Sequence, residues 1–473
     1  MWRFFKDFFI YGIASVLGKI AAVLLMPVYT SILTKEEYGT MALIIACKGI
    51  IDLVYILNLH TAGSRDYYEK DISRKKLVST GFFSILTMSA AVMAALLLSR
   101  RFWMEDVIGI DMRFESAFIF MLLSVPAGSL MSYFAILTRF RKKPVLYAAG
   151  TLLQLFIQIG ISVAGVVWLR RGIESIFFGV LAGEIVAVLI FAFINRSDIG
   201  FTWSGKYLRR LLLFAVPTLP AILAGWLDNS VGQFLIKKFI SVEDLGVYSI
   251  ALSISSAFAL VSVAFNNVWS PFLFENYDKP GFRKTTGDLY SILMLAMLSL
   301  TSLVSLFSRE IVLLLSNPGY LDAARYLILL CFPMCVYILF PVASSGVSVS
   351  RDTKYIGIAY MLGSAFNLAA MFLTIRRWGI ISVPLCLGLS RIITYFFLYL
   401  ISEKTIHLRL PQKYILALLV SVALYYFLAA AGTALWIRAL LAVSLNAAIF
   451  VALRNKVDFS TLKAHLIKNK EQA

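Results

Sequence analysis

Long runs of apolar residues recur along the whole chain and are separated by short polar stretches. A helix needs about 20 apolar residues to cross the hydrocarbon core of a bilayer, and most of these runs reach that length. The pattern therefore predicts an all-α integral membrane protein with about 14 transmembrane helices. The expected helices cover residues 8–33, 38–61, 78–99, 116–137, 146–169, 175–194, 212–236, 244–270, 288–308, 325–346, 355–375, 379–401, 414–432 and 435–453.

Composition supports this interpretation and excludes several classes of protein. Hydrophobic residues make up 60% of the 473 residues and charged residues only 15%, whereas soluble domains average about 45–50% and about 25%. These values exclude a soluble enzyme, a disordered chain and a disulfide scaffold. The net charge of +18 would suit nucleic acid. We expect no nucleic-acid partner, because so apolar a chain would not remain in the cytosol.

The basic residues are distributed unevenly between the two sides of the predicted bundle. Loops that follow even-numbered helices are longer and carry about twice the Lys and Arg of the opposite loops, as in 74–76 and 139–143. By the positive-inside rule, these loops and both chain termini are predicted to be cytoplasmic. The excess charge would also attract anionic membrane lipids of the inner leaflet.

Three pairs of segments come into register when the sequence is shifted by 207 residues. The pairs are Glu36–Gly39 with Glu243–Gly246, Leu122–Pro126 with Leu329–Pro333, and Arg171–Ser175 with Trp378–Ser382. The shift moves six predicted helices, an even number, so both copies would enter the bilayer from the same side. This predicts two parallel six-helix repeats around a central cavity. The expected parts are lobes at 1–205 and 206–405, and two additional helices with a basic cytoplasmic tail at 406–473.

Six charged residues lie inside predicted spans: Lys19, Lys48, Asp52, Glu184, Asp228 and Arg391. A charge at the bilayer centre costs a few kcal/mol, so these side chains should face protein or water. Lys19 has no acidic neighbour within one turn, and we expect it to line the cavity and bind an anion. Lys48 and Asp52 are one turn apart and can form a local ion pair. Alternatively, Lys48 binds an anionic substrate group and Asp52 sets its charge state.

The other buried charges suggest ion coupling or gating. Asp228 follows Pro217 and Pro220, which would kink its helix, and either carries a coupling ion or bonds to another helix. Glu184 and Arg391 are related by the 207-residue shift. These two residues would either form an ion pair between the lobes or line separate walls of the cavity. We expect them to have a structural role or to gate the cavity. Together with Asp52, Glu184 and Asp228 are the candidates for coupling to H⁺ or Na⁺.

The sequence contains no recognisable cofactor, metal or catalytic motif. Its four cysteines lie in predicted spans, where we expect them to pack as small apolar residues. Its three histidines are far apart in the sequence. Neither set has the spacing of a metal site, and no phosphate-binding loop or nucleophile motif occurs. We therefore expect neither a cofactor nor catalytic residues.

The first loop carries a resemblance to a known family. Segment Pro27–Gly39 places a proline near the end of the first helix, then the acidic pair Glu36-Glu37, then Tyr38-Gly39 at the start of the second. This pattern resembles the polysaccharide transporter family, which includes the Wzx-type O-antigen flippases. Two further segments, Val242–Tyr248 and Asn317–Ala324, are similar to that family as well.

The resemblance implies a fold and a function. The fold would be that of the multidrug and toxin extrusion (MATE) proteins and the lipid II flippases, all members of the multidrug/oligosaccharidyl-lipid/polysaccharide exporter (MOP) superfamily. The chain would flip polyprenyl-phosphate- or pyrophosphate-linked oligosaccharide to the outer leaflet of the bacterial cytoplasmic (inner) membrane. The product would be a lipopolysaccharide O-antigen or an exopolysaccharide. Expected partners are this lipid-linked oligosaccharide, a polysaccharide polymerase and its chain-length machinery.

Two alternatives remain open at the level of sequence. A MATE-like drug or metabolite antiporter should have an acidic or aromatic cavity, whereas the first lobe offers Lys19 and Lys48 against Asp52. A membrane-embedded polymerase or glycosyltransferase should have large outer loops with catalytic acidic or arginine residues. The longest outer loops, near 100–115 and 309–324, contain no convincing set. The sequence thus favours a transporter over an enzyme.

Overall fold

The computed structural model is predominantly helical. It describes residues 17–18, 20–56, 59, 67, 72–350, 352 and 354–456, and no strand occurs among them. Within them, 11 helices are long and apolar enough to cross a membrane, and Ile20–Ile32 is a shorter apolar helix. The predicted all-α membrane fold is confirmed, while the count of 14 helices and the repeat layout stay predictions. Contacts divide the chain into unit 1, Met1–Ser249, and unit 2, Ile250–Ala473.

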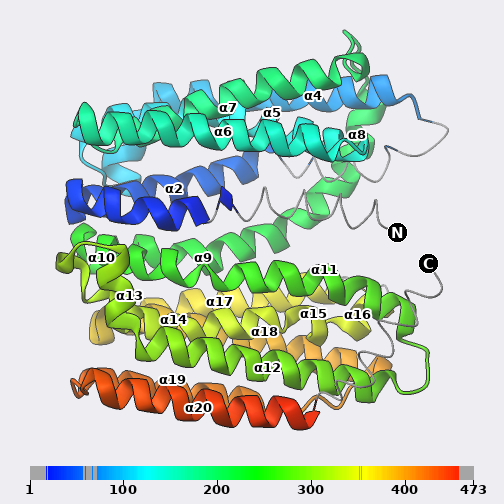
Figure 1. Cartoon of the computed structure of the whole chain (residues 1–473). Coiled ribbons are helices and arrows are strands. Elements are labelled where there is room, and N and C mark those ends of the chain that lie inside the picture. Colours follow the sequence, from blue (N-terminus) through cyan, green and yellow to red (C-terminus); the bar gives the residue numbers. More distant parts are fainter. Residues whose placement is uncertain are drawn as a thin grey trace. The chain divides into compact units, whose positions relative to one another are not determined.

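Unit 1 consists of apolar helices that pack side by side (Figure 1). Helix α5 packs against α4 and α7, α6 packs against α7, and α2 packs against α5 and α9. The bounds are α2 Lys35–Ile56, α4 Arg74–Leu98, α5 Glu115–Phe140, α6 Pro144–Val163, α7 Glu174–Asn195, α8 Gly205–Ala215, α9 Leu219–Phe239 and α10 Val242–Ser255, whose last residues enter unit 2.

Unit 2 is built in the same way. Helix α18 packs against α14, α15, α16 and α17, and α12 packs against α14, α19 and α20. The bounds are α11 Phe258–Asn276, α12 Phe282–Leu306, α13 Ser308–Leu315, α14 Ala323–Ile338, α15 Phe340–Ala343, α16 Ser345–Val349, α17 Lys354–Trp378, α18 Ser382–Ile406, α19 Lys413–Ala430 and α20 Leu435–Lys456.

Proline interrupts two of the expected helices. The run expected at 212–236 is split between α8 and α9 by a 3₁₀ turn, Val216–Thr218, which contains Pro217. The run expected as one helix at 325–346 is broken into α14, α15 and α16 around Pro341. A proline lacks the N–H of the helical ladder and clashes with the preceding turn. The interruption is local, because Ala323–Val349 still forms one candidate membrane span, as the apolar run predicted.

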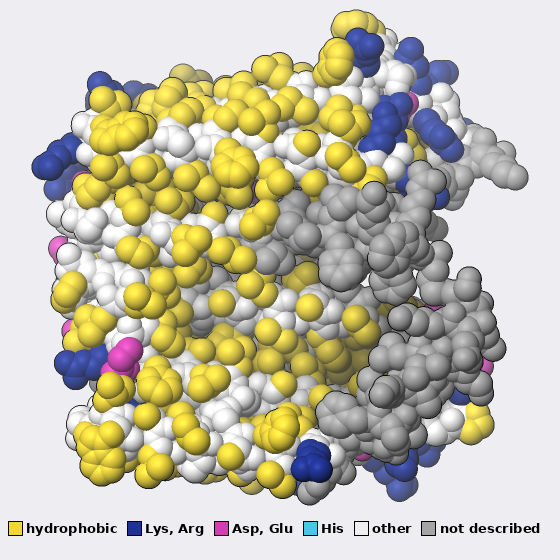
Figure 2. All heavy atoms as spheres, in the orientation of Figure 1, with side chains coloured by type: hydrophobic (Ala, Val, Ile, Leu, Met, Phe, Trp, Pro, Cys, Tyr) yellow, Lys and Arg dark blue, Asp and Glu magenta, His cyan; other side chains and the backbone are white. Residues whose placement is uncertain are grey.

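Many of the hydrophobic side chains face outward. Exposed examples are Leu153 and Phe156 on α6, Leu189 on α7, and Leu440 and Val443 on α20. Figure 2 shows such side chains along the length of α6 and α7, with Lys and Arg gathered towards the helix ends. Helices that expose apolar faces of this length are suited to contact with lipid.

Candidate functional site

Three charged side chains and a serine meet inside unit 1. The Lys48 Nζ atom lies 3.4 Å from Glu184 Oε1 and 4.0 Å from Asp52 Oδ2. It also donates a hydrogen bond of 3.1 Å to Ser124 Oγ. The side chains of Lys48 and Glu184 are only 17% and 11% exposed. The arrangement is therefore an inter-helix cluster rather than a surface ion pair.

Three helices position this cluster. Lys48 and Asp52 lie one turn apart on α2, so both side chains leave the same face. Helix α5 contributes Ser124, and α7 contributes Glu184. Gly128 on α5 lies directly beside this carboxylate, since a Cβ atom there would lie 2.8 Å from Glu184 Oε1. Gly128 thus makes room for the carboxylate that Lys48 binds.

The cluster has more negative than positive charge. With all groups ionised, two carboxylates face one ammonium, which leaves a formal charge of −1. Asp52 Oδ1 and Glu184 Oε2 are buried and have no hydrogen-bond partner among the described residues. Buried, unsatisfied carboxylate oxygens are costly unless a proton or cation binds them. No group of three or more potential His, Cys, Asp or Glu metal ligands occurs among the described residues.

The structure thus brings together two expectations that the sequence kept apart. The local Lys48–Asp52 contact is present, but Glu184 lies closer to Lys48 than Asp52 does. The sequence linked Glu184 to Arg391 through the 207-residue shift, since spacing alone gives no information on contacts between α2 and α7. Gating by Glu184 and Arg391 stays a prediction.

Of the other three charged residues singled out in the sequence, two lie in the part of the chain that the structure describes. Lys19 lies outside the described residues. Asp228 is buried on α9, close in sequence to Trp226, whose Nε1 donates a hydrogen bond of 3.1 Å to the Ala46 carbonyl on α2. The Arg391 guanidinium stacks on the Tyr337 ring in unit 2, 4.4 Å from its centroid. Aromatic stacking of this kind stabilises a buried cation.

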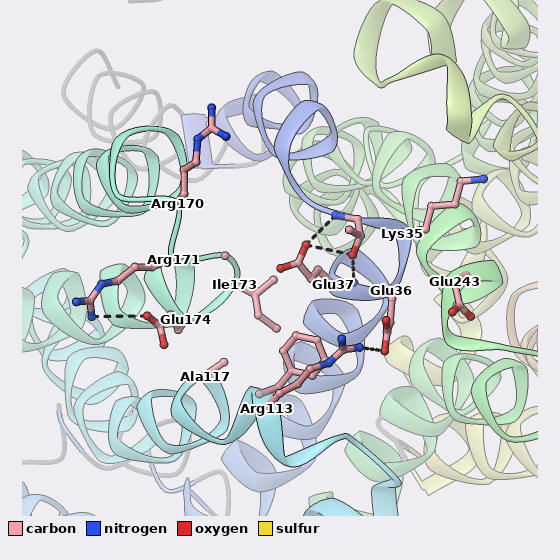
Figure 3. Close-up of a pocket in the computed structure, with 13 residues that line it drawn as sticks. Lys35, Glu36, Glu37, Arg113, Ala117, Arg170, Arg171, Ile173, Glu174 and Glu243 are labelled. Carbon is pink, nitrogen blue, oxygen red and sulfur yellow. Dashed lines mark hydrogen bonds and ion pairs between the residues drawn. The ribbon is translucent and has the colours of Figure 1, made fainter.

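A second polar site in unit 1 is a pocket with a volume of about 770 Å³. Its 13 lining residues include Thr34–Glu37 of the first loop. In Figure 3, Glu37 points into the pocket, while Arg170 and Arg171 point away from its centre. Arg113 pairs with Glu36, and Arg171 lies 3.7 Å from Glu174. The sequence singled out 36–39 as a repeat marker and as part of the family resemblance, and 171–175 as a repeat marker. That both line one pocket could not be read from their spacing.

Comparisons with solved structures place the fold. The chain is similar to the lipid II flippase MurJ in its inward closed conformation, with a TM-score of 0.71, 16% identity and coverage of 98% of this chain and 100% of that chain. It is also similar to an inward-facing MATE family multidrug resistance transporter of the MOP superfamily, with a TM-score of 0.67 and 13% identity. That match covers 82% of this chain and 94% of the transporter. The Vibrio cholerae MATE transporter VcmN in its bent form gives a TM-score of 0.57, 14% identity and coverage of 89% and 98%.

Sequence comparisons supply the family. No curated protein matches the chain. The profile of the family described as "Polysaccharide biosynthesis protein" matches residues 28–325, which is more than half of the chain. The resemblance seen in the first loop is thereby confirmed, and together with the MurJ- and MATE-like fold it shows that this multi-pass membrane protein belongs to the polysaccharide biosynthesis protein family.

Proposed function

We propose that this protein is a flippase that moves polyprenyl-phosphate- or pyrophosphate-linked oligosaccharide from the inner to the outer leaflet of the bacterial cytoplasmic membrane. The observation that carries the proposal is the buried cluster of Lys48, Asp52 and Glu184 in a MurJ-like fold. Buried charges in a transporter fold mark substrate or ion sites by default. A lysine beside two carboxylates offers both an anion-binding group and a site for a coupling ion.

The proposed cycle is alternating access. The sugar headgroup enters from the cytoplasmic side while the prenyl chain stays in the lipid, and Lys48, with Lys19, binds the phosphate or pyrophosphate. In the described cluster, Lys48 is already neutralised by Glu184 and Asp52. An arriving phosphate adds negative charge, so it favours uptake of H⁺ or Na⁺ on one of these carboxylates. Asp228 is a further coupling candidate, and Arg391 a gating candidate.

The proposal includes a biological setting. Both termini would be cytoplasmic, and the substrate would be assembled on the inner leaflet. The flipped oligosaccharide would pass to a polysaccharide polymerase and its chain-length machinery, for O-antigen or exopolysaccharide. The protein itself would be a transporter and not an enzyme, which agrees with the flippase and MATE transporters that share its fold.

Gene deletion tests the proposal directly. Loss of the gene should cause a lipid-linked oligosaccharide to accumulate on the inner leaflet and should remove surface glycan. The Lys48→Ala variant and a Lys19→Ala/Lys48→Ala double variant should fail to restore glycan at normal protein levels. Lys354→Ala, whose side chain is 65% exposed, is the matched control and should restore it. Normal glycan in the double variant would contradict the anion-binding role of these lysines.

A drug or metabolite antiporter is the second candidate, and one observation favours it. The described cluster contains two carboxylates for one lysine, a balance that suits a cationic substrate. Under this function, deletion should raise cellular accumulation of a cationic dye such as ethidium and leave lipid-linked sugars unchanged. The two functions therefore predict opposite results in the same deletion strain.

A further inference from the structure

Unit 2 contains a second pocket whose chemistry differs from that of the charged cluster. It has a volume of about 270 Å³ and lies among α11, α14, α15, α16, α17 and α18. Its lining contains no Lys, Arg, His, Asp or Glu; aromatic rings, small hydroxyls and one amide predominate. Pockets for drug-sized ligands are about 300–1,000 Å³. This one therefore suits a single uncharged ring.

The aromatic part of the wall is held rigidly. Trp269 is 2% exposed, donates a hydrogen bond of 3.1 Å to the Pro341 carbonyl and stacks on Phe265. Tyr337 and Phe340 lie with their ring centroids 5.2 Å apart, and the Arg391 guanidinium packs over both rings. A ligand would therefore meet ring faces that are already fixed in place, which lowers the entropy lost on binding.

The polar part of the lining has unused hydrogen-bonding capacity. The side chains of Ser262, Asn266, Ser270 and Ser348 line the pocket and make no hydrogen bond with other described residues. An amide supplies two donors and an acceptor, and each hydroxyl supplies one donor and two acceptor positions. Such groups, without charge, match ligand hydroxyls better than a phosphate or an organic cation.

The backbone beside the pocket points to a ligand independently of the side chains. Helix α14 ends at Ile338, and the chain continues as the short helices α15 and α16, with Pro341 and Ser344 in the pocket wall. The α-helical pattern is interrupted only at Leu339 and Ser344, within one span, Ala323–Val349. Discontinuous helices form substrate sites in transporters. Here the break and the hydroxyl-rich wall coincide.

We propose that this pocket binds one uncharged sugar ring of the transported headgroup. A pyranose has an apolar C–H face that can pack against Tyr337, whose side chain is 38% exposed, and an edge of hydroxyls that Asn266 and the serines can bind. The inference rests on the proposed flippase function and adds a sugar contact to the phosphate contact assigned to Lys48. By the predicted topology, α11 ends towards the cytoplasm, which is the side from which the headgroup enters.

Binding of simple glycosides tests this pocket directly. The full chain in lipid nanodiscs would be titrated with the neutral probes methyl glucoside and methyl N-acetylglucosaminide, followed by saturation-transfer NMR. Charged probes would be methyl glucuronide and tetraphenylphosphonium. The neutral glycosides should bind best, and Asn266→Leu should weaken them about tenfold, as expected when one well-made hydrogen bond is lost. Asn267→Leu, an exposed neighbour that does not line the pocket, is the control.

The possible outcomes distinguish a failure of the sugar pocket from a failure of the proposed flippase function. If Asn266→Leu does not fold, as judged by elution profile and thermal unfolding, Ser270→Ala replaces it, with Ser444→Ala on α20 as its control. Unchanged glycoside binding, or a preference for tetraphenylphosphonium, overturns the sugar pocket. A deletion strain that accumulates no lipid-linked sugar overturns the flippase function instead. Weakened glycoside binding with reduced surface glycan in the same variant supports both.

Discussion

Gly39 on α2 and Gly246 on α10 pack backbone to backbone. A Cβ atom on Gly39 would collide with the Val242 carbonyl oxygen and lie 3.0 Å from the Gly246 nitrogen. A Cβ atom on Gly246 would collide with the Lys35 carbonyl oxygen and lie 3.2 Å from the Gly39 nitrogen. The 207-residue shift relates the two glycines and also relates Lys35 to Val242. The contact is therefore reciprocal, as a local twofold axis would make it.

The two glycines should not tolerate a methyl group. Gly39→Ala or Gly246→Ala should destabilise the protein by about 1–3 kcal/mol, because α2 and α10 must separate to relieve the overlap. Thermal unfolding of the purified protein measures the effect. Gly225→Ala on α9 is the control, since a Cβ atom there would meet nothing within 4 Å. A destabilisation by Gly225→Ala equal to that of the other two would disprove the packing argument.

The helices that carry these glycines begin with equivalent capping interactions. Glu37 accepts hydrogen bonds from the backbone N–H and the hydroxyl of Thr34, at 2.8 and 3.1 Å. The Thr34 hydroxyl also accepts from the Glu37 N–H at 3.1 Å. Likewise, the Ser241 hydroxyl accepts from the Asp244 N–H at 3.0 Å and donates to the Asp244 carboxylate at 2.8 Å. Thr34→Val and Ser241→Val should each cost about 1 kcal/mol. Thr87→Val in the middle of α4 should show a smaller loss in the same unfolding measurement.

The Lys48–Glu184 contact should appear as an energetic coupling. Removal of one partner from a buried pair leaves an uncompensated charge, whereas removal of both relieves it. A double-mutant cycle with Lys48→Ala and Glu184→Ala should therefore give a coupling of about 0.5–3 kcal/mol. Chemical or thermal unfolding of the four proteins would measure it. Additive single effects would show that the two side chains do not interact.

The Glu310–Arg438 pair should make the stability of unit 2 depend on acid pH. Arg438 donates hydrogen bonds of 3.0 and 2.7 Å to the two Glu310 oxygens. Partial burial raises the pKa of Glu310. The hydrogen bonds from Arg438, a backbone hydrogen bond and the positive charges of Arg438 and Arg309 outweigh this effect and lower the pKa below its ordinary value. A carboxylate with a lowered pKa stabilises the fold above the unfolded-state pKa, and this stability is lost as the pH falls through the folded-state pKa.

Comparison of the wild type with Glu310→Gln measures this effect. Wild type should be the more stable above about pH 5, and the difference should shrink as the pH falls below about 4. Because Glu310 is partly exposed, the difference should be small and should decrease with added salt. Arg325→Ala is the control, because its pair with Asp322 is more exposed on both sides. A difference that does not change with pH would contradict the proposed pairing.

Much of the fold could be predicted from the sequence, because long apolar runs in a membrane leave the backbone few alternatives to a helix. The expected spans 116–137 and 175–194 match α5 and α7 closely. Pro217 correctly marked an interruption, whereas Pro126 and Pro333 lie inside α5 and α14. A proline indicates that a helical hydrogen bond is missing, but only the packing around it determines whether the helix continues.

The sequence by itself determined that the chain is an all-helical membrane protein, that its charges in the spans need polar surroundings, and that residues one helical turn apart, such as Lys48 and Asp52, share a face. These properties are local, since they follow from helix geometry and the cost of charge in lipid. Only the tertiary structure decided that Glu184 joins Lys48, and that Asn266, Trp269 and Tyr337 surround one pocket. Such contacts depend on the rotation and spacing of separate helices, and hydrophobic patterning in lipid-facing helices barely constrains either.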